Sequence, residues 1–352
     1  MEQRIAFVRS KDKTNIAYAL SGEGPPLVRA GTWLTHVHHD WESPIWAHWL
    51  RFMSSRHTLV RYDPRGCGLS QTDVQTTTFD DWVDDLEAVV DRLELKSFPL
   101  FGMSQGAAVA AEYAIRHPER VSQLTLYAPL MTGWRGRSDP ISQQWQSMEK
   151  LVLSGWGDSN MAFPSMFAHL FLPESSPETR QLYAELQRKS ASKEAASCLM
   201  QVLSGLHAFA RLKEIHVPTL VIQIARDQVI DPKLVTGMAG EIQGSEFASI
   251  NSGNHILLED EPGWQEFKNI FTRHVPAGVA LKATGDPKLF EQLSKREQQI
   301  LRSIAKGLSN QQIADSLFIS EKTVRNHITN IFDKLGVSSR AQAIVLAKES
   351  GL

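Results

Sequence analysis

One segment constrains the fold more than any other, because a strand, a sharp turn and a helix follow one another between Phe98 and Ile115. The turn, residues 102–106, reads Gly-Met-Ser-Gln-Gly, which is the G-x-S-x-G pattern of a nucleophile held on a tight turn. Glycine is needed on both sides of the serine, since a Cβ there would collide with the neighbouring strand and helix. The amides at the start of the helix favour negative charge developing at the turn. The segment therefore predicts a nucleophilic serine, Ser104.

Short β-rich runs alternate with helical stretches over the first 275 residues. Strands are expected at residues 5–8, 16–20, 26–30, 58–62, 98–101, 123–127 and 218–224. Strands separated by helices indicate a mainly parallel sheet covered on both faces, and the first strands, which lack intervening helices, indicate an antiparallel edge. Residues from about 130 to 211 read as helices only, so we expect a helical cap between two strands. The predicted fold class of this part is α/β.

Two downstream residues complete a candidate catalytic set with Ser104. A serine hydroxyl is a poor nucleophile unless a base takes its proton, and a third group must orient that base. Asp227 follows the predicted strand that ends at residue 224, and His255 lies between an apolar run at residues 247–250 and a helix. Serine, aspartate and histidine in this order along the chain are typical of one hydrolase fold.

Further motifs make residues 1–275 resemble the α/β-hydrolase family. Residues 62–70 read Tyr-Asp-Pro-Arg-Gly-Cys-Gly-Leu-Ser, similar to the family's Y-D-x-R-G-x-G-x-S turn, and residues 260–262 read Asp-Glu-Pro. The resemblance implies an α/β-hydrolase fold with a helical cap, and serine chemistry of the esterase or lactonase kind. A scaffold that keeps the fold and has lost the chemistry is the alternative.

The resemblance also assigns roles to individual residues. It implies that Ser104 is the nucleophile, His255 the general base and Asp227 the acid that orients it. The backbone N–H groups of Thr32 and Gln105 would form the oxyanion hole. The family usually has His-Gly directly before the first of these two residues, whereas this chain has Ala-Gly.

Aromatic side chains are dense in the loop after the third strand and in the cap. We expect Trp33, Trp134, Met161 and Phe167 to line a pocket for a flexible apolar ligand. Large aromatic residues are as often ordinary core, which stays open as the alternative.

A metal site is not expected. Residues 36–41 read His-Val-His-His-Asp-Trp, which approaches the H-x-H-x-D-H pattern of metal-dependent lactonases but has Trp41 in place of the last histidine. No cofactor is predicted either. With only two cysteines, no leader-like start and no apolar run of about 18 residues, the sequence favours a cytoplasmic protein that does not contact membranes.

Charge is distributed unevenly along the chain. The totals are 37 Lys+Arg and 39 Asp+Glu, a net charge of −2, but residues 281–352 hold 11 of the former and 7 of the latter. The C-terminal part is therefore +4 and the rest, with 26 and 32, is −6. The split indicates an acidic body joined to a small module that touches nucleic acid. Gly, Pro and Ala punctuate residues 276–287, the predicted linker, and the pattern beyond residue 288 is purely helical.

The C-terminal pattern predicts four short helices. Ser294 with Glu297 and Ser309 with Gln312 form capping boxes. The third helix has a buried stripe of Val324, Ile328, Ile331, Phe332 and Leu335. Its opposite face carries Lys322, Arg325, Asn326, Thr329 and Asp333. A short helix and a tight turn precede it, which predicts an all-α helix-turn-helix domain with this helix as the recognition helix; a bundle helix with a solvated polar side is the alternative.

This module closely resembles the LuxR-type DNA-binding domain, through the residues at 293–297, 307–310, 320–324 and 334–337. The resemblance implies a homodimer formed through the last helix, residues 340–348, which reads the two halves of a palindromic promoter site. It places Arg325, Asn326 and Thr329 at bases, and Lys322, Thr323 and Arg340 nearer phosphates.

Three functional hypotheses follow from the two parts of the chain. The leading one is a transcription regulator whose hydrolase-like domain senses a small apolar ester, lactone or related molecule. The second is a working serine hydrolase in which DNA binding is secondary or turnover ends the signal. A version intermediate between these two hypotheses makes the acyl-enzyme itself the active signal. The third treats the hydrolase-like body as a dimerisation scaffold without a ligand.

Overall fold

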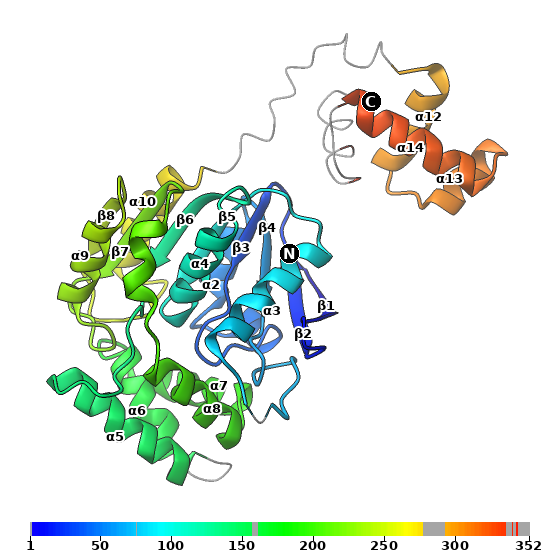
Figure 1. The fold of residues 1–352 in the computed structure, drawn as a ribbon. Coiled ribbons are helices and arrows are strands. Elements are labelled where there is room, and N and C mark those ends of the chain that lie inside the picture. The colour runs from blue at the N-terminus through cyan, green and yellow to red at the C-terminus, as the bar shows by residue number, and fades with distance from the viewer. Residues whose placement is uncertain are drawn as a thin grey trace. The chain divides into compact units, whose positions relative to one another are not determined.

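Backbone contacts divide the chain into two compact units, Met1–Gly278 and Val279–Leu352 (Figure 1). The computed structural model describes residues 2–74, 76–156, 161–276, 293–335, 340 and 343. Most of the predicted linker, and most of the predicted last helix at 340–348, lie outside the described residues. Each unit is described by itself below.

The described part of the first unit is built on one eight-stranded sheet in the order β1-β2-β4-β3-β5-β6-β7-β8. The strands are β1 (Gln3–Arg9), β2 (Asn15–Ser21), β3 (Pro26–Arg29), β4 (Thr58–Tyr62), β5 (Phe98–Met103), β6 (Val121–Tyr127), β7 (Thr219–Ile224) and β8 (Glu246–Ile250). The β1–β2 and β2–β4 pairs are antiparallel, and the remaining pairs are parallel. The mainly parallel sheet with an antiparallel edge is therefore confirmed.

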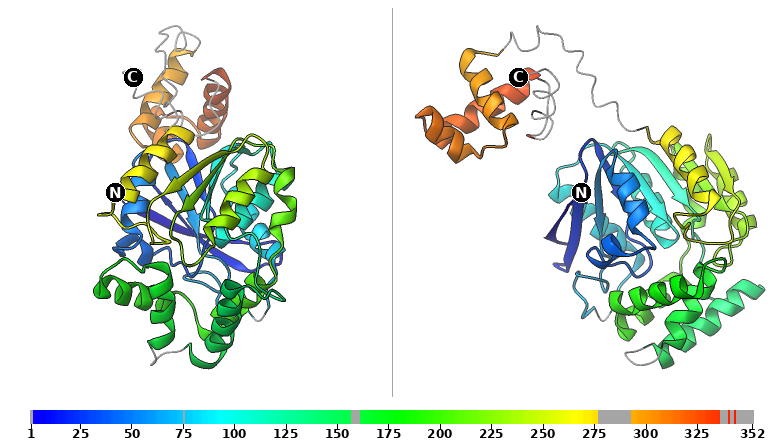
Figure 2. Two further views of the ribbon diagram at one scale, coloured as in Figure 1. Left: turned by 90° about the vertical axis from the view of Figure 1, so that its left-hand side faces the viewer. Right: turned by 180° about the vertical axis from the view of Figure 1, so that it is seen from behind.

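Helices cover both faces of this sheet (Figure 2). They are α1 (His39–Glu42), α2 (Ala47–Ser54), α3 (Phe79–Arg92), α4 (Gln105–Arg116), α9 (Pro232–Glu241) and α10 (Pro262–His274). On one face α2 and α10 share an aromatic cluster, in which the ring centroids of Trp49 and Phe267 are 4.5 Å apart and those of Trp49 and Trp264 are 4.8 Å apart. On the other face α3 packs against α4. The burial of these large rings stabilises the sheet between the two layers.

A helical cap lies between β6 and β7, as the sequence predicts. It consists of α5 (Pro140–Gly155), α6 (Ala162–Phe171), α7 (Pro177–Ser190), α8 (Lys193–Ser204) and the 3₁₀ helix η1 (Ala208–Glu214). Asp139, Ser176 and Ser192 cap α5, α7 and α8 by accepting a hydrogen bond from a backbone N–H of the first turn. Figure 1 shows the cap helices together at one end of the strands, the end at which β5 leads into α4.

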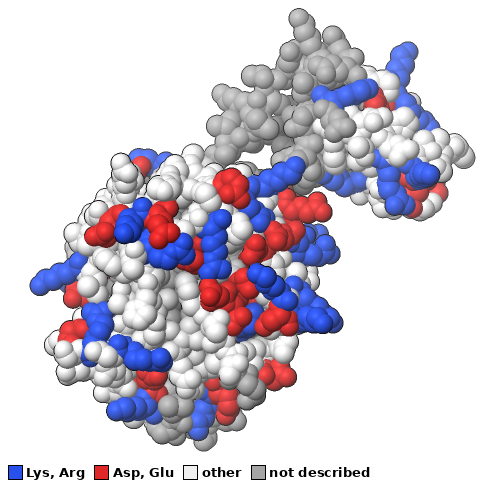
Figure 3. All heavy atoms as spheres, viewed as in Figure 1, with Lys and Arg blue, Asp and Glu red and all other residues white. Residues whose placement is uncertain are grey.

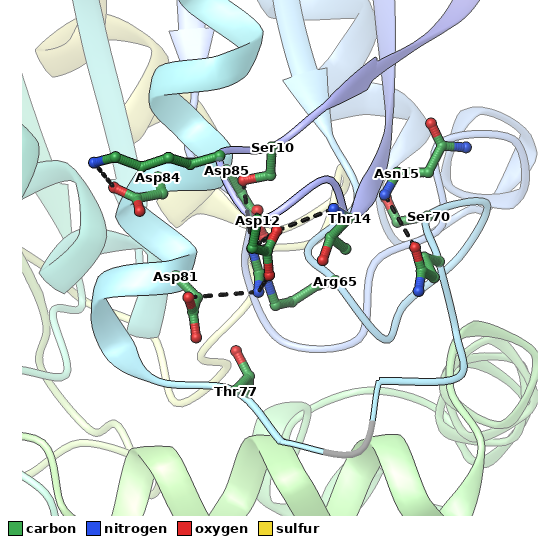
Figure 4. Close-up of polar contacts among 12 residues, drawn as sticks. Ser10, Asp12, Thr14, Asn15, Arg65, Ser70, Thr77, Asp81, Asp84 and Asp85 are labelled. Atoms are coloured by element: carbon green, nitrogen blue, oxygen red, sulfur yellow. Dashed lines mark hydrogen bonds and ion pairs between the residues drawn. The ribbon is translucent and has the colours of Figure 1, made fainter.

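A buried arginine fixes the loop between β4 and α3 (Figure 4). The guanidinium of Arg65 donates to both carboxylate oxygens of Asp85, at 2.9 and 2.6 Å, and to Asp12 at 2.8 Å. The side chain of Asp85 is fully buried, so this bidentate pair neutralises a carboxylate that water does not reach. The pair explains the arginine of the Y-D-x-R-G-x-G-x-S turn as a structural residue.

Positive and negative side chains alternate over the face of the first unit that Figure 3 shows, with no single-sign field. The negative net charge of this unit is therefore not concentrated in one patch on that face. No helix among the described residues is both long and apolar enough to span a membrane.

The second unit contains α12 (Lys295–Ala305), α13 (Asn310–Leu317) and α14 (Glu321–Leu335). Its core holds Leu293, Ile300, Leu301, Ile304, Ile313, Ala314, Val324, Ile331 and Ala343. Both predicted capping boxes are present, at the starts of α12 and α13. Ile328 and Phe332 pack against this core, whereas the side chains of Asp333 and Leu335 lie outside the description.

Candidate functional site

Ser104 sits on the turn between β5 and α4 in a backbone conformation that non-glycine residues rarely adopt, with φ +53° and ψ −123°. The backbone N–H of Ser104 donates to the carbonyl of Tyr127 on β6, at 2.9 Å. A Cβ on Gly102 would lie 2.5 Å from the carbonyl oxygen of Gly106, and one on Gly106 would lie 2.6 Å from that of Gly31. The two glycines thus permit a strained turn that presents the serine above the sheet.

We expect Gly102→Ala to lower the free energy of unfolding by about 1–3 kcal/mol, because the new methyl group has no room beside α4. Gly237→Ala is the matched control: a Cβ at Gly237, inside α9, meets no atom within 4 Å. Alanine there should be neutral or stabilise by up to about 1 kcal/mol. Urea unfolding followed by tryptophan fluorescence measures both, since all nine tryptophans lie in the first unit. Equal losses in the two variants would contradict the account of the turn.

The histidine and the aspartate of the candidate triad are joined. Nδ1 of His255 lies 2.7 Å from Oδ2 of Asp227, and both side chains are almost completely buried. Oδ1 of Asp227 accepts hydrogen bonds from the backbone N–H groups of Val229, at 2.8 Å, and Ile230, at 3.3 Å. The carboxylate is therefore held by its own loop, and it fixes the ring of His255 in one orientation.

The bond between serine and histidine is not formed in this structure. Nε2 of His255 is buried and has no hydrogen-bond partner among the described residues. The edge of the Phe171 ring approaches His255, with the ring centroids 5.0 Å apart. Catalytic hydrogen bonds are often long in unliganded enzymes and tighten only around a substrate. The contact between Asp227 and His255 is thus formed, whereas the hydrogen bond between His255 and Ser104 is not.

The two predicted oxyanion-hole residues lie next to the serine. The hydroxyl of Thr32 donates to the carbonyl of Met103, at 3.0 Å, which ties its loop to the residue before Ser104. Gln105 is the first residue of α4, where a backbone N–H has no partner within the helix. Neither backbone N–H donates to an acceptor within the part of the chain that the structure describes. Both donors are free to bind an oxygen at the serine.

An apolar cavity of about 20 Å³ adjoins Ser104 and Gln105. The remaining lining residues are apolar: Trp33, Leu130, Trp134, Trp145, Phe167, Phe171, Met200, Leu203, Val229 and Ile230. This volume holds about one water molecule, so the cavity is too small for an organic ligand in this conformation.

Three of the four predicted pocket residues line this cavity, namely Trp33, Trp134 and Phe167. Met161 does not line it; this residue is the N-cap of α6 and packs against the core as a partly buried side chain. Sequence reasoning did not single out Val229 and Ile230, which lie two and three residues after Asp227 and reach the cavity because their loop folds around that carboxylate.

A buried glutamine links the oxyanion loop to the cap. The indole N–H of Trp33 donates to Oε1 of Gln187 on α7, at 3.1 Å. The amide of Gln187 in turn donates to the carbonyl of Pro164 on α6, at 3.3 Å, and its side chain is fully buried. Movement of the cap must therefore break these bonds or carry the loop next to Thr32 along.

The histidine run packs on itself. The ring centroids of His36 and His39 are 4.1 Å apart, and burial lowers the pKa of His36 to about 4. Asp40 faces Arg61 at 4.0 Å, and burial raises the pKa of its carboxyl to about 6. No group of three histidine, cysteine or acidic side chains among the described residues is arranged to hold a metal ion.

The outer face of α14 carries the predicted DNA-contacting side chains. Lys322, Arg325, Asn326 and Thr329 are exposed, while Val324 is buried beneath them. The hydroxyl of Thr323 is hydrogen-bonded to that of Ser320, the residue before the helix, at 2.7 Å. The side chain of Arg325 pairs with Glu321 at 3.2 Å.

Arg340 has partners inside the second unit. Its guanidinium donates to the side chain of Asn310, at 2.9 Å, and to the carbonyl of Leu308. A phosphate contact by Arg340 stays a prediction, and these bonds show that the residue also braces the start of α13. Phe318, which the sequence reasoning passed over, occupies the turn between α13 and α14 with φ +53° and is 95% exposed.

Comparison with known proteins agrees with this division. The family model of the α/β hydrolase fold matches residues 34–262, and that of the bacterial regulatory proteins of the luxR family matches residues 291–347. A serine on a strand-to-helix turn beside an Asp–His pair, on a mainly parallel sheet, defines a hydrolase-type domain. The chain belongs to the α/β-hydrolase-fold family, and its second unit carries a DNA-binding domain of the LuxR family.

Solved structures similar to the first unit include a hydrolase from Pseudomonas aeruginosa PA01, with 22% identity and a TM-score of 0.64 over 78% of this chain and 98% of that one. An esterase from Exiguobacterium antarcticum has 21% identity and a TM-score of 0.66, over 77% and 98%. The enol-lactonase from Burkholderia xenovorans LB400 has 18% identity and a TM-score of 0.64, over 77% and 99%. At these identities the likeness shows the fold alone.

Curated relatives include the response regulator protein VraR of Staphylococcus saprophyticus, 48% identical over 154 residues, which are 44% of this chain and 72% of that protein. A nitrate/nitrite response regulator protein homolog of Haemophilus influenzae is 34% identical over 130 residues, 34% of this chain and 62% of its own length. The chain thus spans under two thirds of the length of the Haemophilus relative, and 42% of VraR from Staphylococcus epidermidis.

Proposed function

We propose that this protein is a DNA-binding transcription regulator whose hydrolase-like unit binds a small apolar ester, lactone or related acyl compound at Ser104. The observation that carries the proposal is the small apolar cavity beside the serine. Because the cavity has room for about one water molecule, a ligand enters only if the cap moves. Occupied and empty states then differ in cap conformation, which is the difference that a ligand needs in order to shift an equilibrium.

The chemistry of the cavity favours an acyl compound. All described lining residues other than Ser104 and Gln105 are apolar, so a charged ligand would lose its hydration without compensation. A single carbonyl oxygen, in contrast, would find the backbone N–H groups of Thr32 and Gln105. An apolar acyl chain with one carbonyl satisfies both conditions.

The same groups define a first chemical step. Nε2 of His255 takes the proton of Ser104 while the serine oxygen bonds to the carbonyl carbon, and the carbonyl oxygen becomes an anion held by Thr32 and Gln105. Asp227 stabilises the protonated ring. When the carbonyl re-forms, the alkoxide leaves with the proton of His255 as an alcohol and the acyl group stays on Ser104. Water activated by the same histidine releases the acid.

DNA binding is proposed for α14. The exposed row formed by Lys322, Arg325, Asn326 and Thr329 presents cationic and amide donors from one helix face, after a short helix and a tight turn. Such a helix enters the major groove, and two copies would read the halves of a palindromic site as a homodimer. The curated relatives, which are named as response regulator proteins, support this part of the proposal.

An active serine hydrolase is the second candidate, because the 2.7 Å contact between His255 and Asp227 is already made. Release of p-nitrophenol from p-nitrophenyl butyrate separates the two. For a sensor we expect a burst of about one equivalent per chain followed by turnover slower than about 1 per second, the lower end of ordinary enzymes. Linear release above that rate, with no burst, would favour the hydrolase.

A further inference from the structure

A second and larger cavity lies on the opposite side of α8 from Ser104. This groove of about 610 Å³ is formed by the loop before α3, the end of α4 and the segment from Gln201 to Arg211. Thr77 belongs to that loop, which runs below the Arg65 network toward a cap helix (Figure 4). Ligand sites commonly measure roughly 300–1,000 Å³. Unlike the cavity at Ser104, this one has room for a small molecule without rearrangement.

The base of the groove holds two arginines in fixed positions. Oε1 of Glu112, whose side chain is 6% exposed, accepts from Nε of Arg116 at 2.7 Å and from Nη1 of Arg211 at 2.5 Å. One nearly buried carboxylate thus aligns two guanidinium groups from α4 and η1. Their outer N–H groups are held by exposed acids, Asp80 for Arg116 and Glu214 for Arg211. Such exposed pairs contribute little to stability, so a bound anion would compete with Asp80 and Glu214 at little cost.

A third arginine reaches the groove from the cap. Arg135 donates to the carbonyl of Gln201, at 3.0 Å, and to the hydroxyl of Ser204, at 2.7 Å, at the end of α8. Both bonds use one nitrogen, Nη2. No carboxylate among the described residues lies within ion-pair distance of Arg135. Its guanidinium charge therefore has no ion-pair partner in the described part of this groove.

We propose that this groove binds a small organic anion through a carboxylate or phosphate group held by Arg135 together with Arg116 and Arg211. Guanidinium groups bind both kinds of oxyanion, so the two are one chemistry at this site. Asp80, Glu112 and Glu214 pair with Arg116 and Arg211, so Arg135 supplies the unpaired charge, and threonine hydroxyls at 76–78 add neutral donors. The first unit would thus bind a polar ligand in this groove, in addition to the apolar ligand proposed at Ser104.

Helix α8 is the shared wall of the two sites. Met200 and Leu203 line the cavity at Ser104, whereas Gln201 and Val202, on the other face of the helix, line the groove. Trp134 likewise lines the apolar cavity, and the next residue, Arg135, lines the groove. An anion bound to Arg135 would therefore contact the same helix, and the neighbour of the same tryptophan, that line the cavity at Ser104.

The test uses the full-length protein with inorganic phosphate and with succinate, at constant ionic strength kept by sodium chloride. Titration is followed by calorimetry and by tryptophan fluorescence, to which Trp134 contributes, stacked on Trp145 at 5.3 Å. We expect at least one probe to saturate with a dissociation constant of about 1 mM or below. Saturation by phosphate alone, succinate alone or both tells whether the natural ligand carries phosphate, carboxylate or either. If neither saturates by about 20 mM, the proposal is wrong.

Two variants and a control locate the binding. Arg135→Gln should weaken binding at least about tenfold, since it removes the charged donor. Gln201→Glu leaves Arg135 in place and adds a negative charge to the exposed wall, so it should weaken binding similarly. Arg137→Gln removes a nearby cation that pairs with Asp139 outside the groove, and should bind as the wild type does. Wild-type affinity in either groove variant overturns the assignment. Because the site does not involve Ser104, Ser104→Ala should bind the anion unchanged even if the proposed chemistry fails.

Discussion

A fluorophosphonate probe should label the wild-type protein on Ser104 and leave Ser104→Ala unlabelled, while His255→Ala should react about 10³-fold more slowly or worse. The reason is the proton on the serine hydroxyl, which only a base at hydrogen-bond distance can remove as the bond to phosphorus forms. Nε2 of His255 can take it, because this buried nitrogen has no hydrogen-bond partner within the described part of the chain. Labelling rates are measured by intact-mass spectrometry over time.

The labelling experiment has a matched control in the same unit. His169 lies on cap helix α6 with its Nδ1 against the carbonyl of Ser165, and is exposed. His169→Ala removes a histidine without touching the triad, so it should label at the wild-type rate. If His255→Ala also labelled at that rate, the serine would be activated without the Asp227–His255 pair and the assignment of the base would be wrong.

The second large effect is expected in the DNA-binding unit. Arg325→Ala should raise the dissociation constant for double-stranded DNA that the wild type selects from a random pool by about 10- to 100-fold, since a base contact by arginine is worth about 1–3 kcal/mol. Fluorescence anisotropy at two salt concentrations measures the change. The pair between Arg325 and Glu321 is solvent-exposed, so its loss should leave the melting temperature of the unit unchanged.

Lys306→Ala provides the comparison for Arg325→Ala. Lys306 is the C-cap of α12 and exposed, so this variant loses the same charge from a different helix. A nonspecific electrostatic effect would appear in both variants, whereas base reading by α14 affects Arg325→Ala alone. Equal losses in the two variants would contradict the recognition-helix assignment.

Much of the fold follows from local patterns in the sequence. The strands lie where β-rich runs alternate with amphipathic stretches, because a covered parallel sheet needs apolar strands. The turn at Ser104 is predictable because only glycine fits at residues 102 and 106. The capping boxes at Ser294 and Ser309 are predictable because each depends on two residues only three apart.

The parts that the sequence did not reveal depend on contacts between distant segments. Glu112 and Arg211 are 99 residues apart, and nothing in either neighbourhood indicates that they meet in a groove. The helical pattern of the cap predicts amphipathic helices but not how they pack, so Met161 was expected in the cavity while Met200 and Leu203 occupy its wall. The small volume of the cavity likewise depends on that packing.

Occupancy at Ser104 is expected to change the affinity of the protein for DNA. The most direct measurement compares the affinity of the full-length protein for its selected DNA before and after stoichiometric labelling of Ser104 by the fluorophosphonate, with equally treated Ser104→Ala as the control. Since allosteric coupling is typically worth about 1–3 kcal/mol, the account predicts that labelling changes the dissociation constant of the wild type by roughly 5- to 150-fold and leaves the variant unchanged. Fully labelled wild-type protein that binds DNA with unaltered affinity would contradict it.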